Sequence, residues 1–180
     1  MSSSNIPAWH KIHTIVFDFD GVFTDNRVWI DQDGLESVSC NRSDGLGFDM
    51  LRNFMRLKNW NLNCFILSKE SNPVVSVRAN KLKIDCVQNI SNKKKYLESY
   101  LLNCNLDPEG LVYMGNDLND MPAMELAGFS ITPSDAHIII LNLADLVLTK
   151  KGGEGCVREF IEVLIGINSM HKNEIEDLLI

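Results

Sequence analysis

The sequence lacks long apolar runs and any excess of positive charge. No apolar stretch approaches the ~18 residues that argue for a membrane-spanning helix. The start of the chain shows no basic region followed by an apolar one, so we expect no secretory signal. Seventeen Lys and Arg against 24 Asp and Glu give a net charge of −7, whereas nucleic-acid-binding proteins carry a basic field. We therefore expect a cytoplasmic protein that binds neither a membrane nor nucleic acid.

Cysteine is scarce and scattered. The five cysteines occupy positions 40, 64, 86, 104 and 156, and no two form a Cys-x-x-Cys pair. This odd, dispersed set indicates free thiols in a reducing compartment, and it argues against a disulfide framework or a structural zinc site. The chain has 180 residues, of which 45% are hydrophobic, so it can bury a sizeable core without such cross-links. We expect one domain, residues 1–180.

Short apolar runs alternate with helical patterns along most of the chain. This alternation predicts an α/β fold with a doubly wound, mostly parallel, Rossmann-like sheet. The predicted strands are residues 14–20, 63–67, 84–87, 111–114, 129–131 and 146–148. The predicted helices are residues 45–58, 73–82, 92–103, 120–127 and 154–167, with a C-terminal tail after 167.

One segment interrupts the alternation directly after the first strand. Residues 28–30 and 35–38 flank a short turn that ends in Gly34, which predicts a β-hairpin flap over about 26–40. Exposed Trp29 and Ile30 would be unfavourable on such a hairpin, so we expect a partner subunit to cover them. The chain leaves no room for a separate cap domain.

Two acidic segments follow predicted strands. Asp18 and Asp20 lie at the end of the first strand, where ligands bind in open α/β sheets. A solvated strand end or a helix N-cap would also use such residues. The second segment, however, supplies more oxygen side chains than one cap needs, and Mg²⁺ prefers oxygen ligands, so we predict a magnesium site. That segment contains Asn116, Asp117, Asn119 and Asp120.

Two further residues suit a phosphate site. Ser68 follows the strand at 63–67 and so reaches the same edge of the sheet, where a hydroxyl could hold phosphoryl oxygens. Lys93 opens a predicted helix, where a cation is unfavourable against the helix dipole. An ordinary surface lysine is the alternative interpretation.

Taken together, these residues resemble the haloacid dehalogenase superfamily of aspartyl-phosphate phosphatases. Asp18-x-Asp20, Ser68, Lys93 and residues 115–120 resemble its four motifs, in the expected order. The resemblance implies that Asp18 is the nucleophile and Asp20 the general acid and base. It also implies that Asp18, the backbone carbonyl of Asp20 and Asn116 hold Mg²⁺, with Asp117 and Asp120 behind them. Asn116 stands where many members have an aspartate.

Other segments resemble the sugar-acid branch of this superfamily, namely residues 20–25, 43–47 and 152–159. That branch contains 3-deoxy-octulosonate 8-phosphate phosphatases, which serve lipopolysaccharide biosynthesis, nonulosonate (sialic acid type) 9-phosphate phosphatases, and the C-terminal domains of some CMP-sialate synthetases. The resemblance implies a homotetramer in which hairpins of neighbouring subunits close each site. Glu154 replaces an arginine that is usual in the tail.

The resemblance also implies which residues bind the substrate. They are Thr24, Asp44, Glu70, Arg78 and Lys81. Arg78 and Lys81 are three apart on a predicted helix, so they share a face that could bind a sugar carboxylate. A surface salt-bridge cluster is the alternative. We predict a phosphatase for a nonulosonate 9-phosphate; the alternatives are the eight-carbon 8-phosphate, or a non-catalytic oligomerisation domain that partners a CMP-sialate synthetase.

Overall fold

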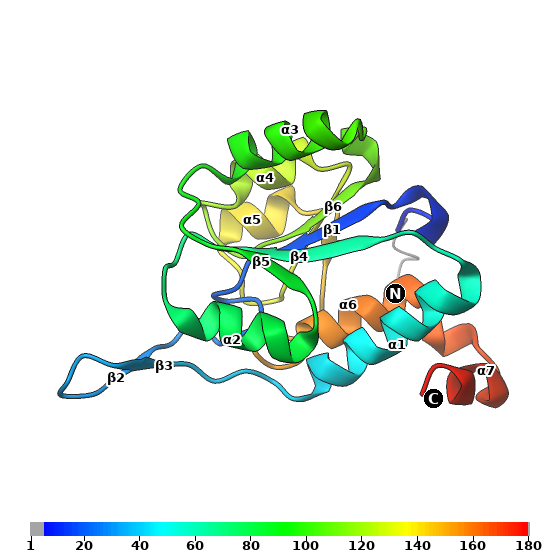
Figure 1. The fold of residues 1–180 in the computed structure, drawn as a ribbon, viewed down its shortest axis with the longest axis horizontal. Helices are drawn as coiled ribbons and strands as arrows, with labels where there is room; N and C mark the ends of the chain where they lie inside the picture. The colour runs from blue at the N-terminus through cyan, green and yellow to red at the C-terminus, as the bar shows by residue number, and fades with distance from the viewer. Residues whose placement is uncertain (1–5, 180) are drawn as a thin grey trace.

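A six-stranded parallel sheet forms the centre of the molecule in the computed structural model, which describes residues 6–179 (Figure 1). The strand order is β5-β4-β1-β6-β7-β8, and every neighbouring pair is parallel. The strands are β1 (Thr14–Phe17), β4 (Asn63–Leu67), β5 (Asp85–Val87), β6 (Leu111–Met114), β7 (Phe129–Thr132) and β8 (Leu146–Val147). The predicted fold class is therefore confirmed.

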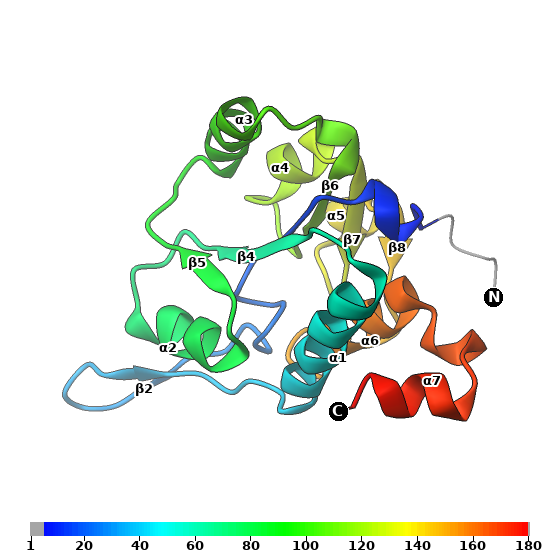
Figure 2. The same cartoon turned by 45° about the vertical axis from the view of Figure 1, so that its right-hand side comes forward.

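Helices cover both faces of this sheet (Figures 1 and 2). One face carries α1 (Ser43–Lys58), α2 (Pro73–Leu82) and α6 (Cys156–Ile165), and the other carries α3 (Lys93–Cys104), α4 (Met121–Leu126) and α5 (Ile138–Leu143). Each layer has its own core of buried side chains. On the first face Phe17 packs edge-on against Phe48 and Phe160, which joins β1 to α1 and α6.

Two elements differ from the sequence-based predictions. Helix α5 is all apolar except for one asparagine and is only six residues long, so its sequence carries no helical period. The His137 ring caps the start of this helix by accepting a hydrogen bond from the backbone N–H of Ile139, and Ile140 is buried in the core of this sheet face. The segment after 167 contains a short 3₁₀ turn (Ile167–Ser169) and α7 (Lys172–Asp177). It is fixed to α1 because Leu178 is buried and its carbonyl accepts a hydrogen bond from Asn53.

The predicted hairpin is present and projects away from the sheet (Figure 2). Strands β2 (Trp29–Ile30) and β3 (Glu36–Ser37) pair antiparallel. The Asp31 side chain accepts the N–H groups of Asp33 and Leu35, and this closes the turn. The apolar side chains stay exposed, with Trp29 74% and Ile30 64% accessible.

None of the helices in residues 6–179 is both long enough and apolar enough to cross a membrane.

Candidate active site

The predicted motif residues meet at the carboxyl ends of β1, β4 and β6. The parallel register places Phe17 beside Ile66 and Met114, so the loops that follow these strands leave the sheet together. They enclose a cavity of about 210 Å³. It is lined by Asp18, Asp20, Asn26, Ser68, Lys69, Glu70, Asn116, Asp117 and Asn119.

Lys93 is buried against two carboxylates. Its Nζ lies 2.6 Å from Asp18 Oδ1 and 2.7 Å from Asp120 Oδ1, and all three side chains are almost fully buried. Burial lowers the pKa of Lys93, but the charges of Asp18 and Asp120 outweigh this effect and raise the pKa above its usual value. Lys93 is therefore a fixed cation at the site, and the surface interpretation of this lysine is wrong.

Asp120 connects this cation to the loop after β6. Its Oδ2 accepts the backbone N–H groups of Asn116 at 3.0 Å and of Asp117 at 3.3 Å. Its Oδ1 accepts both Lys93 and the hydroxyl of Tyr113, the latter at 2.8 Å. Gly115 allows this approach, because a Cβ there would lie 2.6 Å from the Asp120 side chain. Sequence reasoning missed Tyr113, although a hydroxyl within an apolar strand next to a motif is a usable signal.

The donors at this edge fit a magnesium ion. The Asn116 Oδ1 atom is buried and has no hydrogen-bond partner within the described part of the chain. Gly21 makes room for this amide, since a Cβ there would lie 2.0 Å from Asn116 Nδ2. Asp18 and Asp20 supply oxygens beside it, in the same cavity as Asn116. Carboxylates outnumber ammonium groups at this edge: the acidic side chains are those of Asp18, Asp20, Glu70, Asp117 and Asp120, and the ammonium groups are those of Lys69 and Lys93. A divalent cation would therefore help to balance the charge.

The two aspartates of the first motif both have raised pKa values. Burial, reinforced by the charge of Asp120, raises the pKa of Asp18 from 3.8 to about 8, against the opposing effect of Lys93. Partial burial, followed by the charge of Glu70, raises the pKa of Asp20, and Lys93 again opposes the shift. A cation beside Asp18 would favour its ionised form, which is the nucleophilic one. A raised pKa suits a general acid, which must hold a proton to give.

Ser68 is buried at the end of β4. Its Oγ accepts the backbone N–H of Glu70 at 3.0 Å, and its own N–H donates to the carbonyl of Val87. These bonds leave the hydroxyl proton of Ser68 free to be donated at the edge of the cavity.

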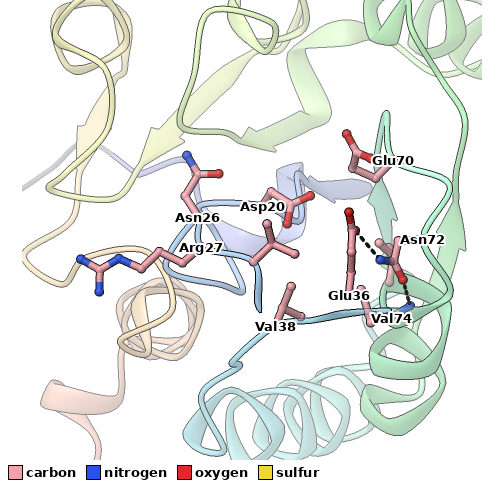
Figure 3. A pocket seen from close by; sticks show the side chains of 10 residues that line it. Asp20, Asn26, Arg27, Glu36, Val38, Glu70, Asn72 and Val74 are labelled. Carbon is pink, nitrogen blue, oxygen red and sulfur yellow. Dashed lines mark hydrogen bonds between the residues drawn. The ribbon is translucent and has the colours of Figure 1, made fainter. Parts of the chain in front are cut away.

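Two further cavities continue outward beneath the hairpin. The inner one, of about 280 Å³, presents the carboxylates of Asp20, Glu36 and Glu70 (Figure 3). Glu36 Oε2 accepts a hydrogen bond of 2.7 Å from Asn72, so β3 is linked to the start of α2. The outer groove, of about 860 Å³, runs between the hairpin and α2 and is lined in part by Glu70, Arg78 and Lys81.

Arg78 is held in place by the backbone. Its guanidinium donates to the carbonyl of Asn41 at 2.6 Å, and its Nε is buried without a partner among residues 6–179. Lys81 is exposed one turn further along α2. The structure thus brings Glu70, Arg78 and Lys81 to one groove, and no carboxylate pairs with Arg78 or Lys81 in the described chain.

Two of the expected substrate-binding residues, Thr24 and Asp44, do not line these cavities. Thr24 is fully buried, and its hydroxyl oxygen accepts the N–H groups of Gly21 and Asn26, so it holds the turn after β1 together. Asp44 is also fully buried and accepts the N–H of Arg158 at the start of α6. Neither side chain lines the cavities described above, because both are used to pack the loops beneath them.

Residues 152–153 lie under the turn that follows β1 of the same chain. A Cβ at Gly152 would lie 2.0 Å from the carbonyl oxygen of Gly21, so residues 152–153 support the turn after β1. Glu154, which replaces the usual arginine, points to the exposed surface.

Comparison with known proteins places this arrangement in a family. The family model for haloacid dehalogenase-like hydrolases matches residues 61–161. The chain belongs to the haloacid dehalogenase-like hydrolases. A HAD family hydrolase from Streptomyces avermitilis has a similar structure, with a TM-score of 0.84 and 40% identity over 94% of this chain and 95% of that one.

Two further relatives are sugar-acid phosphatases. The 3-deoxy-D-manno-octulosonate 8-phosphate phosphatase KdsC of Salmonella typhi is 31% identical, and the match covers 86% of this chain and 80% of the relative. The corresponding phosphatase of Moraxella catarrhalis, solved in complex with magnesium ion, phosphate ion and a KDO molecule, is 28% identical over 88% of each chain, with a TM-score of 0.78. The predicted family and the predicted enzyme class, a phosphoric monoester hydrolase, are confirmed.

Proposed function

We propose that this chain is a magnesium-dependent phosphatase of a sugar-acid phosphate and that it acts through an aspartyl-phosphate. Two observations together carry the proposal. Lys93 forms a buried ion pair with Asp18 and Asp120, and the nearby Asn116 amide oxygen is buried without a hydrogen-bond partner in the described residues. The enzyme class and magnesium as the cofactor agree with the family and with the magnesium-containing relative.

In this mechanism Asp18 attacks phosphorus and Asp20 protonates the departing sugar oxygen. Asp20 then takes a proton from the water that hydrolyses the aspartyl-phosphate. Lys93 and the Ser68 hydroxyl stabilise charge on the transferring oxygens. Asp18, the Asp20 carbonyl and Asn116 would hold Mg²⁺, which screens the repulsion between the nucleophile and the phosphate. Asp117 and Asp120 orient these residues. Asp120 does so through its hydrogen bonds from Lys93 and from the N–H groups of Asn116 and Asp117.

The favoured substrate is a 3-deoxy-octulosonate 8-phosphate, which would place the enzyme in lipopolysaccharide biosynthesis. The relatives of known activity named above act on this compound. They are about 30% identical to this chain over most of both lengths, so the eight-carbon alternative has better support than the nine-carbon prediction.

A nonulosonate 9-phosphate is the second candidate. It is favoured by Arg78 and Lys81, which lie with Glu70 in one groove and could bind a carboxylate that is remote from the phosphate. The volume of that groove, about 860 Å³, allows the longer substrate.

The functional unit we propose is a homotetramer assembled through the hairpin. Val28, Trp29, Ile30 and Leu35 are all at least 49% exposed. An apolar patch of this kind on a projecting flap fits an interface, and a second copy of the chain is the partner that the resemblance implies.

Phosphate release across a panel of sugar-acid phosphates, with and without Mg²⁺, tests the proposal. We expect turnover of eight- or nine-carbon 2-keto acid phosphates that requires Mg²⁺ and disappears in the Asp18→Asn variant. This variant keeps the shape of the side chain but cannot attack phosphorus. Full activity after exhaustive chelation, or turnover by folded Asp18→Asn protein, would contradict the mechanism. The ratio of kcat/KM for the two substrates decides between the candidates.

A further inference from the structure

Tyr113 lies beneath the ion pair at the centre of the active site. It belongs to β6 and is fully buried on the sheet face covered by α3 and α4. Its hydroxyl oxygen lies 2.8 Å from Asp120 Oδ1, and its ring centroid lies 6.0 Å from Lys93 Nζ. One side chain therefore contacts both members of the pair, by a hydrogen bond to the carboxylate and by the ring face toward the ammonium.

The hydroxyl completes the hydrogen bonding of Asp120. A carboxylate has about four acceptor positions, and Asp120 receives four donors: Lys93, Tyr113 and the N–H groups of Asn116 and Asp117. Burial raises the pKa of Tyr113 well above 10, so the hydroxyl keeps its proton and acts as a donor. No other side-chain hydroxyl in the described residues bonds to Asp120.

Without this hydroxyl, Lys93 would be the only donor to Oδ1 of Asp120. A buried carboxylate with an unmet acceptor attracts the remaining cation more strongly, because the low local dielectric strengthens their interaction. The ammonium would then move toward Asp120 and away from Asp18, which it now contacts at 2.6 Å.

We propose that Tyr113 is a positioning residue: its hydroxyl shares the charge of Asp120 and so keeps the Lys93 ammonium beside Asp18 and the transferring phosphoryl group. The inference rests on the proposed function, since Lys93 meets a phosphoryl group only if the chain acts on a phosphate ester. A misplaced ammonium stabilises the transition state less, whereas initial binding also uses Ser68 and the metal. The effect is therefore expected in kcat more than in KM.

The test is Tyr113→Phe, which removes only the hydroxyl and keeps the ring. Tyr100→Phe is the matched control, because the Tyr100 hydroxyl bonds to Thr14 and Asn63 at the opposite edge of the sheet. Both variants are assayed with p-nitrophenyl phosphate and saturating Mg²⁺, and their folding is followed by urea denaturation. We expect kcat to fall about tenfold for Tyr113→Phe, the scale of one hydrogen bond to a charged group, with KM within about twofold. Tyr100→Phe should change kcat by less than about twofold.

A double-mutant cycle with Asp120→Asn separates positioning from a structural role. If Tyr113 acts through the charge of Asp120, the loss of kcat caused by Tyr113→Phe shrinks to less than about twofold in the Asp120→Asn background. An equal loss in both backgrounds, a loss confined to KM, an unchanged kcat or a Tyr113→Phe chain that does not fold would overturn the proposal. Wild-type protein with no activity on any phosphate ester would overturn the proposed function itself.

Discussion

Asp44→Asn is expected to change the pH dependence of stability and to leave substrate binding alone. Asp44 is fully buried in the first turn of α1; one oxygen accepts the N–H of Arg158, and the other has no partner in the described chain. Burial raises the pKa of this carboxyl from 3.8 to about 6, although Arg158, Arg78 and Lys150 oppose the shift. The folded protein therefore binds the Asp44 proton more tightly than the unfolded chain does.

The sign and size of the effect follow from this shift. The contribution of Asp44 to stability is fully present below pH 3.8 and is lost as the pH rises through about 6. A shift of about two units corresponds to about 3 kcal/mol, at 1.36 kcal/mol per unit. The asparagine is neutral throughout, so Asp44→Asn should be more stable than wild type by up to about 3 kcal/mol above pH 7, and the difference should vanish near pH 4.

Urea denaturation of both proteins at several pH values between about 4 and 8 measures this difference, because effects of other titrating groups cancel between them. Asp33→Asn provides a matched control, since the Asp33 side chain lies exposed in the hairpin turn. KM for sugar-acid phosphates should be unchanged by Asp44→Asn. A stability difference that does not vary with pH would refute the reasoning about burial, and a large rise in KM would restore the substrate-binding role expected from the sequence.

Three other outcomes are expected. Gly21→Ala places a Cβ 2.0 Å from the Asn116 amide at a backbone φ of +78°. Activation of the enzyme by Mg²⁺ should therefore be at least tenfold weaker in a Mg²⁺ titration, and an unchanged titration would contradict the metal site. Arg78→Ala should lower about tenfold the ratio of kcat/KM for a sugar-acid phosphate to kcat/KM for p-nitrophenyl phosphate, because the charged pair with the substrate carboxylate is lost. An unchanged ratio would show that Arg78 does not bind the substrate. Trp29→Asp should dissociate the proposed tetramer in sedimentation experiments, whereas Leu102→Asp, at an exposed position of α3, should not. A wild-type monomer would contradict the proposed assembly.

The strands and the motif residues could be predicted because each signal is local. The runs 63–67 and 111–114 are apolar and bounded by polar residues, and the structure has β4 and β6 at these same residues. The parallel order then brings Ser68 and Asn116 to the edge where Asp18 lies. Lys93 could be singled out because a lysine at a helix start is unfavourable unless an anion compensates it.

The remaining features depend on contacts between distant parts of the chain. Thr24 and Asp44 are polar residues within segments that resemble the family, so sequence reasoning gave them substrate contacts. In the structure their oxygens accept hydrogen bonds from the backbone N–H groups of Gly21 and Arg158, which the sequence does not reveal. Tyr113 looked like one more residue of an apolar strand, because its hydrogen bond reaches a residue on the following loop.

The distribution of charge along the cavities constrains how a sugar-acid phosphate can bind. Lys93 provides positive charge at the inner end, beside Asp18, whereas the middle section presents the carboxylates of Asp20, Glu36 and Glu70 (Figure 3). A second anionic group of the substrate would be repelled there, while hydroxyl groups can donate to these carboxylates. Arg27 also lines this middle section, with its guanidinium 3.8 Å from Asp25, and two further positive side chains, Arg78 and Lys81, line the outer groove. The proposed sugar-acid phosphate would fit this order with its phosphate at the inner end, its polyhydroxyl chain in the middle and its carboxylate at the far end. The length of that middle chain would then be the property that distinguishes eight-carbon from nine-carbon acids.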